Sequence, residues 1–286
     1  MTGIFFLIVR VFASPVVNVF QKKLTNSGMH PVAVVLIVYI FFSVLSLGYL
    51  LNSGIGHYTS VFWIYMIMLG IIDALGNIFL IRSLKTIDLS VFGPLNAYKP
   101  VIALILSYFI VKEVPSWAGI AGVLVIIGGS YFLYVGGSPQ AKFIDFLKSG
   151  GIGYRFLSIF LTSVAAVLSK KVILMSSPMV TLSYWSLIGL PPAILFYILG
   201  PGGLRSPDKK SILWFAGLIA SFLILQLFSL YTFKFVFVGY SLALFQLSSV
   251  ISVFFGSRIF REENIAPRYL ACLIMIVGAG IILFWG

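Results

Sequence analysis

The stretch 98–128, YKPVIALILSYFIVKEVPSWAGIAGVLVIIG, contains two apolar runs separated by a short segment with Lys112, Glu113 and Pro115. A helix that crosses the hydrocarbon core of a bilayer needs about 20 mostly apolar residues, because a backbone in lipid must satisfy its hydrogen bonds internally. Extended outward to 89–111 and 116–135, the two runs reach that length. The stretch therefore predicts two consecutive membrane-spanning helices.

The same pattern continues over the whole chain. Of its 286 residues, 60% are hydrophobic and only 9% are charged, whereas soluble proteins have roughly 25% charged residues. These values predict an all-α polytopic membrane protein with ten transmembrane helices. The predicted helices are residues 3–21, 31–51, 62–83, 89–111, 116–135, 152–169, 179–199, 211–233, 239–260 and 267–285. The first is interpreted as a span and not as a signal peptide, because Arg10 interrupts its apolar run.

The last five predicted helices repeat the first five in register. Residues 62–136 align with 212–286 without a gap, and a shift of 148 aligns the opening helices. The aligned pairs that carry the inference are Glu113 with Glu263, Ser107 with Ser257, Gly128 with Gly278, Asn96 with Gln246, Arg10 with Ser158, and Ser14 with Thr162. Because five spans is an odd number, the second set enters the membrane in the opposite sense. We therefore expect two inverted five-helix repeats, 1–136 and 152–286, joined by a linker at 137–151.

The net charge of +12 has a different meaning here than in a soluble protein. In a membrane protein it is explained by loops that face anionic lipid and follow the positive-inside bias, so no nucleic-acid partner is predicted. One side of the membrane collects most Lys and Arg residues, with Arg155 counted just inside the sixth helix. The other side has only Lys112, Lys170, Lys171 and Lys234. This count predicts that both termini lie outside the cytoplasm.

Four residues around the end of the fourth predicted helix have a regular spacing. Glu113 ends that helix, Pro100 stands 13 residues before it, and Gly122 and Gly128 follow 9 and 15 residues after it. Local ion pairing of Glu113 with Lys112 is favoured over a gating role.

The second half keeps part of this spacing. Glu263 and Gly278 are in the same register, but Val250 replaces the proline and Cys272 replaces the first glycine. Over essentially the whole chain the pattern resembles the EamA repeat of the drug/metabolite transporter superfamily. The resemblance implies a ten-helix inverted-repeat fold, a central cavity, alternating access and cytoplasmic termini, the last against the charge count. It also implies export or exchange of a metabolite, and we expect the protein in a bacterial plasma (inner) membrane.

Three ionisable residues lie near the centres of predicted spans: Arg10, Asp73 and Lys99. Such side chains cost at least a few kcal/mol each in a bilayer, so they normally face a partner or a wet cavity. Two cations and one anion leave a positive charge that an anionic substrate group would neutralise. Alternatively, Asp73 pairs with Arg10 or Lys99 only to hold helices together.

Polar side chains accompany these three residues at helical spacing. The predicted substrate-binding set is Arg10, Ser14 and Asn18 on the first helix, Asp73 and Asn77 on the third, Asn96 and Lys99 on the fourth, and Gln246 and Ser249 on the ninth. Taken singly, each polar residue also fits a role in helix packing.

The sequence contains no motif typical of an enzyme. His30 and His57 lie in predicted loops, and the lone Cys272 offers neither a disulfide nor a metal-ligand cluster. We predict no enzyme activity, no cofactor and no metal. Without an ATP-binding motif, transport of a small-molecule substrate would be secondary. The alternatives are a flippase for a lipid-linked substrate and a non-transporting membrane scaffold, which would tolerate the loss of Arg10 or Lys99.

Small residues and aromatic residues predict how the helices pack and where they meet the membrane interface. Glycines of the fifth and tenth helices, such as Gly122 and Gly278, predict close helix approach, within the chain or across a homodimer. The tryptophans, Trp185 among them, are interpreted as anchors at the membrane interface.

Overall fold

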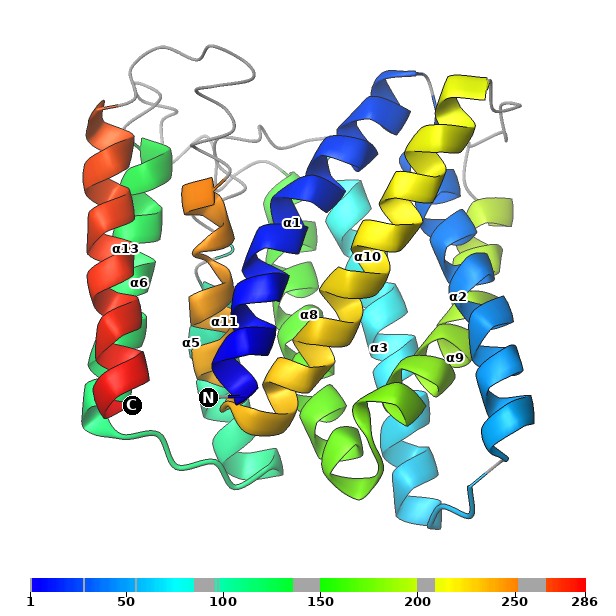
Figure 1. The fold of residues 1–286 in the computed structure, drawn as a ribbon, viewed down its shortest axis with the longest axis horizontal. Helices are drawn as coiled ribbons and strands as arrows, with labels where there is room; N and C mark the ends of the chain where they lie inside the picture. Colours follow the sequence, from blue (N-terminus) through cyan, green and yellow to red (C-terminus); the bar gives the residue numbers. More distant parts are fainter. Residues whose placement is uncertain are drawn as a thin grey trace. The chain divides into compact units, whose positions relative to one another are not determined.

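The structure, a computed structural model, describes residues 2–27, 29–54, 56–84, 96, 98–135, 150–199, 209–251 and 266–286. These residues form helices and no strand, which confirms the predicted all-α class. The helices (Figure 1) are α1 (Thr2–Asn26), α2 (Pro31–Ser53), α3 (Ser60–Leu84), α5 (Tyr98–Ile110), α6 (Trp117–Val135), α8 (Gly150–Met175), α9 (Pro178–Leu199), α10 (Lys209–Phe235), α11 (Val238–Phe245) and α13 (Ala266–Trp285).

Six described segments are long and apolar enough to cross a membrane. They are Thr2–Gln21, Val32–Ser53, Ser60–Leu80, Gly153–Met175, Pro178–Leu199 and Ile212–Phe235. Four shorter apolar segments follow the same order as the remaining predicted spans: Tyr98–Ile110, Trp117–Ser130, Val238–Ile251 and Leu270–Trp285. Parts of the predicted helices 89–111 and 239–260, and the predicted linker up to residue 149, lie outside the described residues. The chain is therefore an integral membrane protein, and ten spans remain a prediction.

Several helices extend beyond their predicted ends. Helix α1 runs to Asn26 instead of residue 21, α8 runs to Met175 instead of residue 169, and α10 runs to Phe235 instead of residue 233. Between residue 169 and Pro178 there is no glycine or proline that would end the helix earlier. A proline disfavours helical geometry in the residue before it, so α8 ends shortly before Pro178. Lys170, Lys171 and Lys234, which were predicted to lie in loops, therefore belong to the last turns of helices.

The helices form two compact units, and each unit takes helices from both halves of the sequence. Unit 1 comprises 1–78 and 168–235, and unit 2 comprises 79–167 and 236–286. Unit 1 thus contains α1, α2, most of α3, the end of α8, α9 and α10. Unit 2 contains α5, α6, the first two-thirds of α8, α11 and α13.

In unit 1, α1 and α10 lie side by side and antiparallel (Figure 1). Phe6, near the start of α1, stacks on Tyr231 near the end of α10, with ring centroids 4.8 Å apart. Near the other end, the ammonium of Lys23 lies 6.0 Å from the ring centroid of Trp214. Burial of these aromatic rings against one another supplies the apolar contact that holds the pair together.

Helices α2 and α9 form the second pair of unit 1. The hydroxyl of Ser43 donates to the backbone oxygen of Ser186 at 3.0 Å, and the hydroxyls of Ser46 and Ser186 lie 2.8 Å apart. All three serines are buried, and hydroxyl hydrogen bonds between helices are a common way of joining spans in lipid. The polar contacts therefore fix the register of α2 on α9.

In unit 2, α6 and α13 pack closely because glycines face each other. A Cβ atom at Gly122 would lie 2.8 Å from the carbonyl oxygen of Gly278, and a Cβ atom at Gly278 would lie 2.8 Å from that of Gly122. Only residues without a side chain allow this approach. The predicted close contact thus occurs within the chain, and a homodimer stays a prediction.

The segment between α5 and α6 connects three helices of unit 2. The buried carboxylate of Glu113 accepts a hydrogen bond from the backbone N–H of Val238, the first residue of α11, at 2.9 Å. The backbone N–H of Ser116 donates to the hydroxyl of Tyr240 on α11, and the Ser116 hydroxyl donates to the backbone oxygen of Trp285. A carboxylate satisfies the free N–H groups of a helix start, so Glu113 stabilises the N-terminus of α11.

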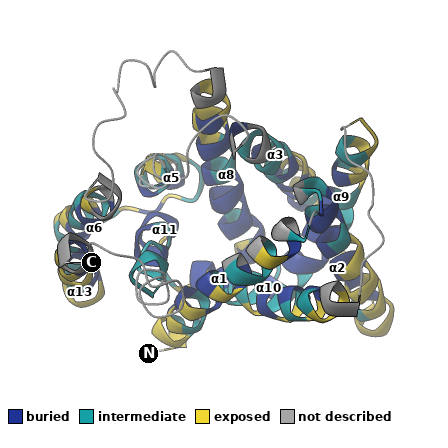
Figure 2. Cartoon of the chain, turned by 90° about the horizontal axis from the view of Figure 1, so that it is seen from above, coloured by how far each residue is buried: buried dark blue, intermediate teal, exposed yellow. Residues whose placement is uncertain are grey.

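The outward faces of the helices are apolar, as a bilayer requires. Leu51 is 84% exposed, Phe284 is 79% exposed and Trp117 is 88% exposed. In contrast, Figure 2 shows α8 as largely buried. Its inward residues include Arg155, Ser158 and Ser163, all without measurable exposure.

Candidate functional site

Asp73 is the centre of a polar cluster in unit 1. It lies in the middle of α3, and one of its carboxylate oxygens, Oδ2, accepts three hydrogen bonds. The donors are the Tyr39 hydroxyl of α2 at 3.3 Å, the Asn77 side-chain amide of α3 at 3.0 Å and the Trp185 indole N–H of α9 at 3.0 Å. Hydrogen bonds to a carboxylate are stronger than those between neutral groups, so the cluster holds the carboxylate in place.

Two members of this cluster were not predicted from the sequence. Tyr39 and Trp185 lie on different helices, are both buried, and have ring centroids 4.9 Å apart. The interpretation of Trp185 as an interfacial anchor is wrong, because the structure places it inside α9 with its N–H on Asp73. Asn77 was predicted, since it follows Asp73 by one helical turn.

The stripe predicted on the first helix also belongs to unit 1. Arg10 is half-buried on α1, and its Nε donates to the hydroxyl of Ser229 on α10 at 3.4 Å. Ser14 is half-buried one turn further along α1. The side chain of Asn18 lies outside what the structure describes. The contact with Ser229 joins α1 to α10, so Arg10 has at least a role in packing.

A second polar cluster lies in unit 2, around Arg155 of α8. Arg155 has no exposed surface and is among the largest fully buried side chains of the described residues. Its terminal nitrogen Nη2 donates to the side-chain oxygen of Asn96. The next turn of α8 carries Ser158, also fully buried. The sequence had placed Arg155 just inside a helix, among the positive charges of one membrane side. The structure instead places it among buried polar groups.

Gln246 joins the same cluster from the end of α11. Its side-chain amide donates to the backbone oxygen of Asn96 at 3.4 Å. Directly after α11 the backbone N–H groups of Gln246, Leu247, Ser249 and Val250 donate to oxygens three residues earlier, as in a 3₁₀ turn. Such a turn inside a long apolar segment often marks a hinge. It separates the helical path of α11 from the residues that follow it.

Lys99 and Ser249 complete the predicted residues of unit 2. Lys99 is half-buried on α5, and its backbone oxygen accepts from the hydroxyl of Ser163 on α8 at 3.4 Å. Ser249 is half-buried in the short helical segment 248–251 that follows α11. The predicted set is therefore divided: Arg10, Ser14, Asp73 and Asn77 belong to unit 1, and Asn96, Lys99, Gln246 and Ser249 belong to unit 2.

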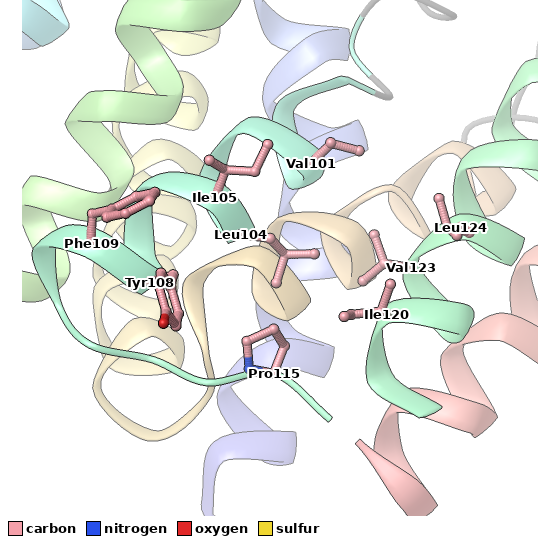
Figure 3. A pocket seen from close by; sticks show the side chains of 9 residues that line it. All are labelled: Val101, Leu104, Ile105, Tyr108, Phe109, Pro115, Ile120, Val123 and Leu124. Atoms are coloured by element: carbon pink, nitrogen blue, oxygen red, sulfur yellow. The ribbon is translucent and has the colours of Figure 1, made fainter. Parts of the chain in front are cut away.

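An apolar groove of about 350 Å³ lies between α5 and α6 in unit 2. Figure 3 shows its lining: Val101, Leu104, Ile105, Tyr108 and Phe109 from α5, Pro115, and Ile120, Val123 and Leu124 from α6. No charged side chain lines it. Among the described residues, no group of three or more His, Cys, Asp or Glu side chains is placed to hold a metal ion.

Comparison with known protein families adds to these observations. Residues 1–135 match the model described as the EamA-like transporter family. The resemblance seen in the motifs around Glu113 is thereby confirmed for this part of the chain, and the family suggests a membrane transporter.

The fold of nearly the whole chain is similar to that of a solved structure. A structure titled "Crystal structure of protein" superposes with a TM-score of 0.76, covering 98% of this chain and 96% of that chain at 15% sequence identity. This similarity establishes a shared fold. No curated protein matches the sequence.

Proposed function

We propose that this protein is a secondary transporter that exports or exchanges a small polar metabolite by alternating access. The observation that carries the proposal is that each unit holds an ionisable side chain within its apolar helices: the half-buried Asp73 in unit 1 and the fully buried Arg155 in unit 2. Charged groups at membrane depth are costly, and in membrane proteins they typically mark substrate or ion pathways. The EamA match supports the same class of function.

Helix pairing supports the inverted-repeat architecture. In the sequence alignment, α2 corresponds to α9 and α6 to α13. Each of these two pairs is also a pair of helices in contact. In α6 and α13 the contact is reciprocal, with Gly122 and Gly278 facing each other. A two-fold axis between repeats produces self-paired helices of this kind. We therefore propose ten spans in two inverted repeats, in a bacterial inner membrane.

The transported molecule is proposed to have an anionic group. Arg10 and Lys99 are cations on predicted spans, and guanidinium and ammonium groups bind carboxylates and phosphates through charge-assisted hydrogen bonds. The polar residues predicted to bind the rest of the molecule are Ser14 and Asn77 in unit 1, and Asn96 and Gln246 in unit 2.

A specific observation favours one alternative function. The groove between α5 and α6 is lined by apolar side chains and would accept an acyl chain. A flippase for a lipid-linked substrate would use such a surface. It would then depend on groove residues such as Leu104 and Val123 more than on Arg10 or Lys99.

A ligand screen tests the proposal. The purified full-length protein would be heated with a panel of small polar metabolites, because a ligand that binds the folded state raises the unfolding midpoint. We expect at least one metabolite to raise it, and Arg10→Gln or Lys99→Gln to weaken its binding about ten- to hundredfold. Lys234→Gln, at an exposed position of α10, is the control. Unchanged affinity in both variants would return Arg10 and Lys99 to a packing role.

A further inference from the structure

The groove between α5 and α6 is apolar along its length and has one polar end. Along α5 its lining runs from Val101 to Phe109, about 12 Å at the rise of an α-helix. Figure 3 shows Val101 and Leu124 toward one end, and Tyr108 and Pro115 toward the other. The Tyr108 hydroxyl is the only polar side-chain group of this lining, so the polar end is the one next to the segment between α5 and α6.

The apolar part of the groove is open to the surroundings of the helices. Ile105 is 56% exposed, Phe109 is 64% exposed and Leu124 is 58% exposed. Exposed apolar patches mark surfaces that bind lipid or another molecule, and the surroundings of a membrane-spanning chain are the hydrocarbon chains of the bilayer. A groove about two helical turns long therefore has the shape and the chemistry for one acyl chain.

A cation stands at the polar end of the groove. Lys112 lies between Phe109 and Pro115, which both line the groove, and it is exposed. The carboxylate of the next residue, Glu113, is buried and accepts a hydrogen bond from the backbone N–H of Val238. The connecting segment thus presents its positive charge at the surface and directs its negative charge inward.

The start of α6 places the same end of the groove at the level of the lipid headgroups. Trp117, the first residue of α6, is 88% exposed, and tryptophan is enriched where a membrane meets water. The N-terminus of a helix also carries the positive end of its dipole, so α6 adds to the attraction of an anion near Lys112. The groove therefore matches a lipid in polarity: anion-attracting at the headgroup level and apolar below it.

We propose that the groove between α5 and α6 holds one acyl chain of an anionic phospholipid of the surrounding bilayer, with the headgroup at Lys112. Lysine side chains near a membrane surface attract anionic lipids. A zwitterionic phospholipid would fill the groove equally well but gain less from the cation. The lipid is held and not transported, so this inference goes beyond the proposed transport function and does not depend on it.

Native mass spectrometry of the full-length protein, released from detergent micelles, tests the site. Phosphatidylglycerol, which is anionic, and phosphatidylcholine, which is zwitterionic, would be titrated with identical acyl chains, and the dissociation constant of the first bound lipid would be measured. We expect phosphatidylglycerol to bind about fivefold more tightly, the effect of one lysine near the headgroup.

Variants of Lys112 test the headgroup contact. The backbone of Lys112 has φ 67°, and asparagine tolerates this left-handed conformation, so Lys112→Asn removes the charge without straining the turn. It should lose the preference for phosphatidylglycerol and leave the binding of phosphatidylcholine unchanged. Lys112→Arg should keep the preference, as should the control Lys234→Gln at an exposed position of α10.

A groove-filling variant tests the acyl-chain contact. Ile105→Trp places a larger ring in the groove from an exposed position and should weaken the binding of both lipids about tenfold, because the chain loses many van der Waals contacts. Ile64→Trp on α3 is the matched control, since Ile64 is 57% exposed and does not line the groove. If Ile105→Trp fails to fold, Leu124→Phe takes its place.

Several results would overturn the proposal. Equal affinity of the natural protein for the two lipids, or an unchanged preference in Lys112→Asn, would remove the headgroup contact, and unchanged binding in the groove-filling variant would remove the chain. Displacement of the lipid by glycerol 3-phosphate would assign Lys112 to a soluble phosphate compound. A dimer that Ile105→Trp dissociates would assign the groove to a second copy of the chain. Movement of labelled phosphatidylglycerol across liposomes by the protein would make the lipid a substrate.

Discussion

Trp185 contributes to the molecule through a hydrogen bond and through the packing of its ring. Its indole N–H lies 3.0 Å from the Asp73 carboxylate, while its ring packs on Tyr39. Replacing the indole by a phenyl ring keeps most of the packing and removes the hydrogen bond. The value of that bond can therefore be measured separately from the burial of the ring.

We expect Trp185→Phe to lower the free energy of unfolding by about 1.5–3 kcal/mol, the usual worth of a hydrogen bond to a charged group. In an Asp73→Ala background the same substitution should cost far less, because the acceptor is gone. Trp214→Phe on α10 is the control and should change stability little. Reversible unfolding in mixed micelles provides the measurement. Equal costs of Trp185→Phe with and without Asp73 would show that the hydrogen bond is energetically unimportant.

Helix α6 has two glycines with opposite surroundings. Gly122 is pressed against Gly278 and Ile282 of α13, whereas nothing lies within 4 Å of a Cβ atom at Gly128. The two positions therefore separate the effect of helix packing from that of helix propensity within one element.

Gly122→Ala should destabilise the protein by about 1–3 kcal/mol, because α6 and α13 must separate to admit the methyl group. Gly128→Ala should be neutral or stabilising by up to about 1 kcal/mol, because alanine favours a helix and has room. Thermal unfolding of both variants checks this. A Gly128→Ala loss as large as that of Gly122→Ala would contradict the described packing of α6.

Sequence periodicity predicted the contacts within one helix. It missed the contacts that depend on which helices pack together. Asn77 was paired with Asp73 because both lie on α3 one turn apart. Tyr39 and Trp185 were missed because apolar periodicity does not say that α2 and α9 pack against α3. Arg155 was misread because a helix start is uncertain by several residues, and α8 begins at Gly150. The signal that would have revealed it is its spacing of three from Ser158.

The orientation of the whole chain rests on its basic residues. Lys170, Lys171 and Lys234 lie in helix ends, and Arg155 is buried, so none of these four belongs to a free loop. When these four residues are left out of the count, most of the remaining Lys and Arg residues still lie on the same predicted side of the membrane. The charge bias therefore still predicts termini outside the cytoplasm, against the cytoplasmic termini that the family implies.

Fusions at Gly286 measure this orientation. Alkaline phosphatase, which is active only outside the cytoplasm, should be active there, and a fluorescent protein that folds only inside should stay dark. The same pair of reporters at the predicted linker 137–151 is the control and should give the reverse result, because five spans separate the two positions. A fluorescent Gly286 fusion without phosphatase activity would establish cytoplasmic termini instead.

Transport by the purified protein tests the central claim most directly. The full-length chain would be reconstituted in liposomes preloaded with a metabolite that stabilises it, and the movement of labelled metabolite would be followed without nucleotide. We predict saturable movement driven by the metabolite gradient or by exchange, reduced at least tenfold in Arg10→Gln and unchanged in Lys234→Gln. Absence of movement above that of protein-free liposomes, with the protein shown to be folded, would contradict the account.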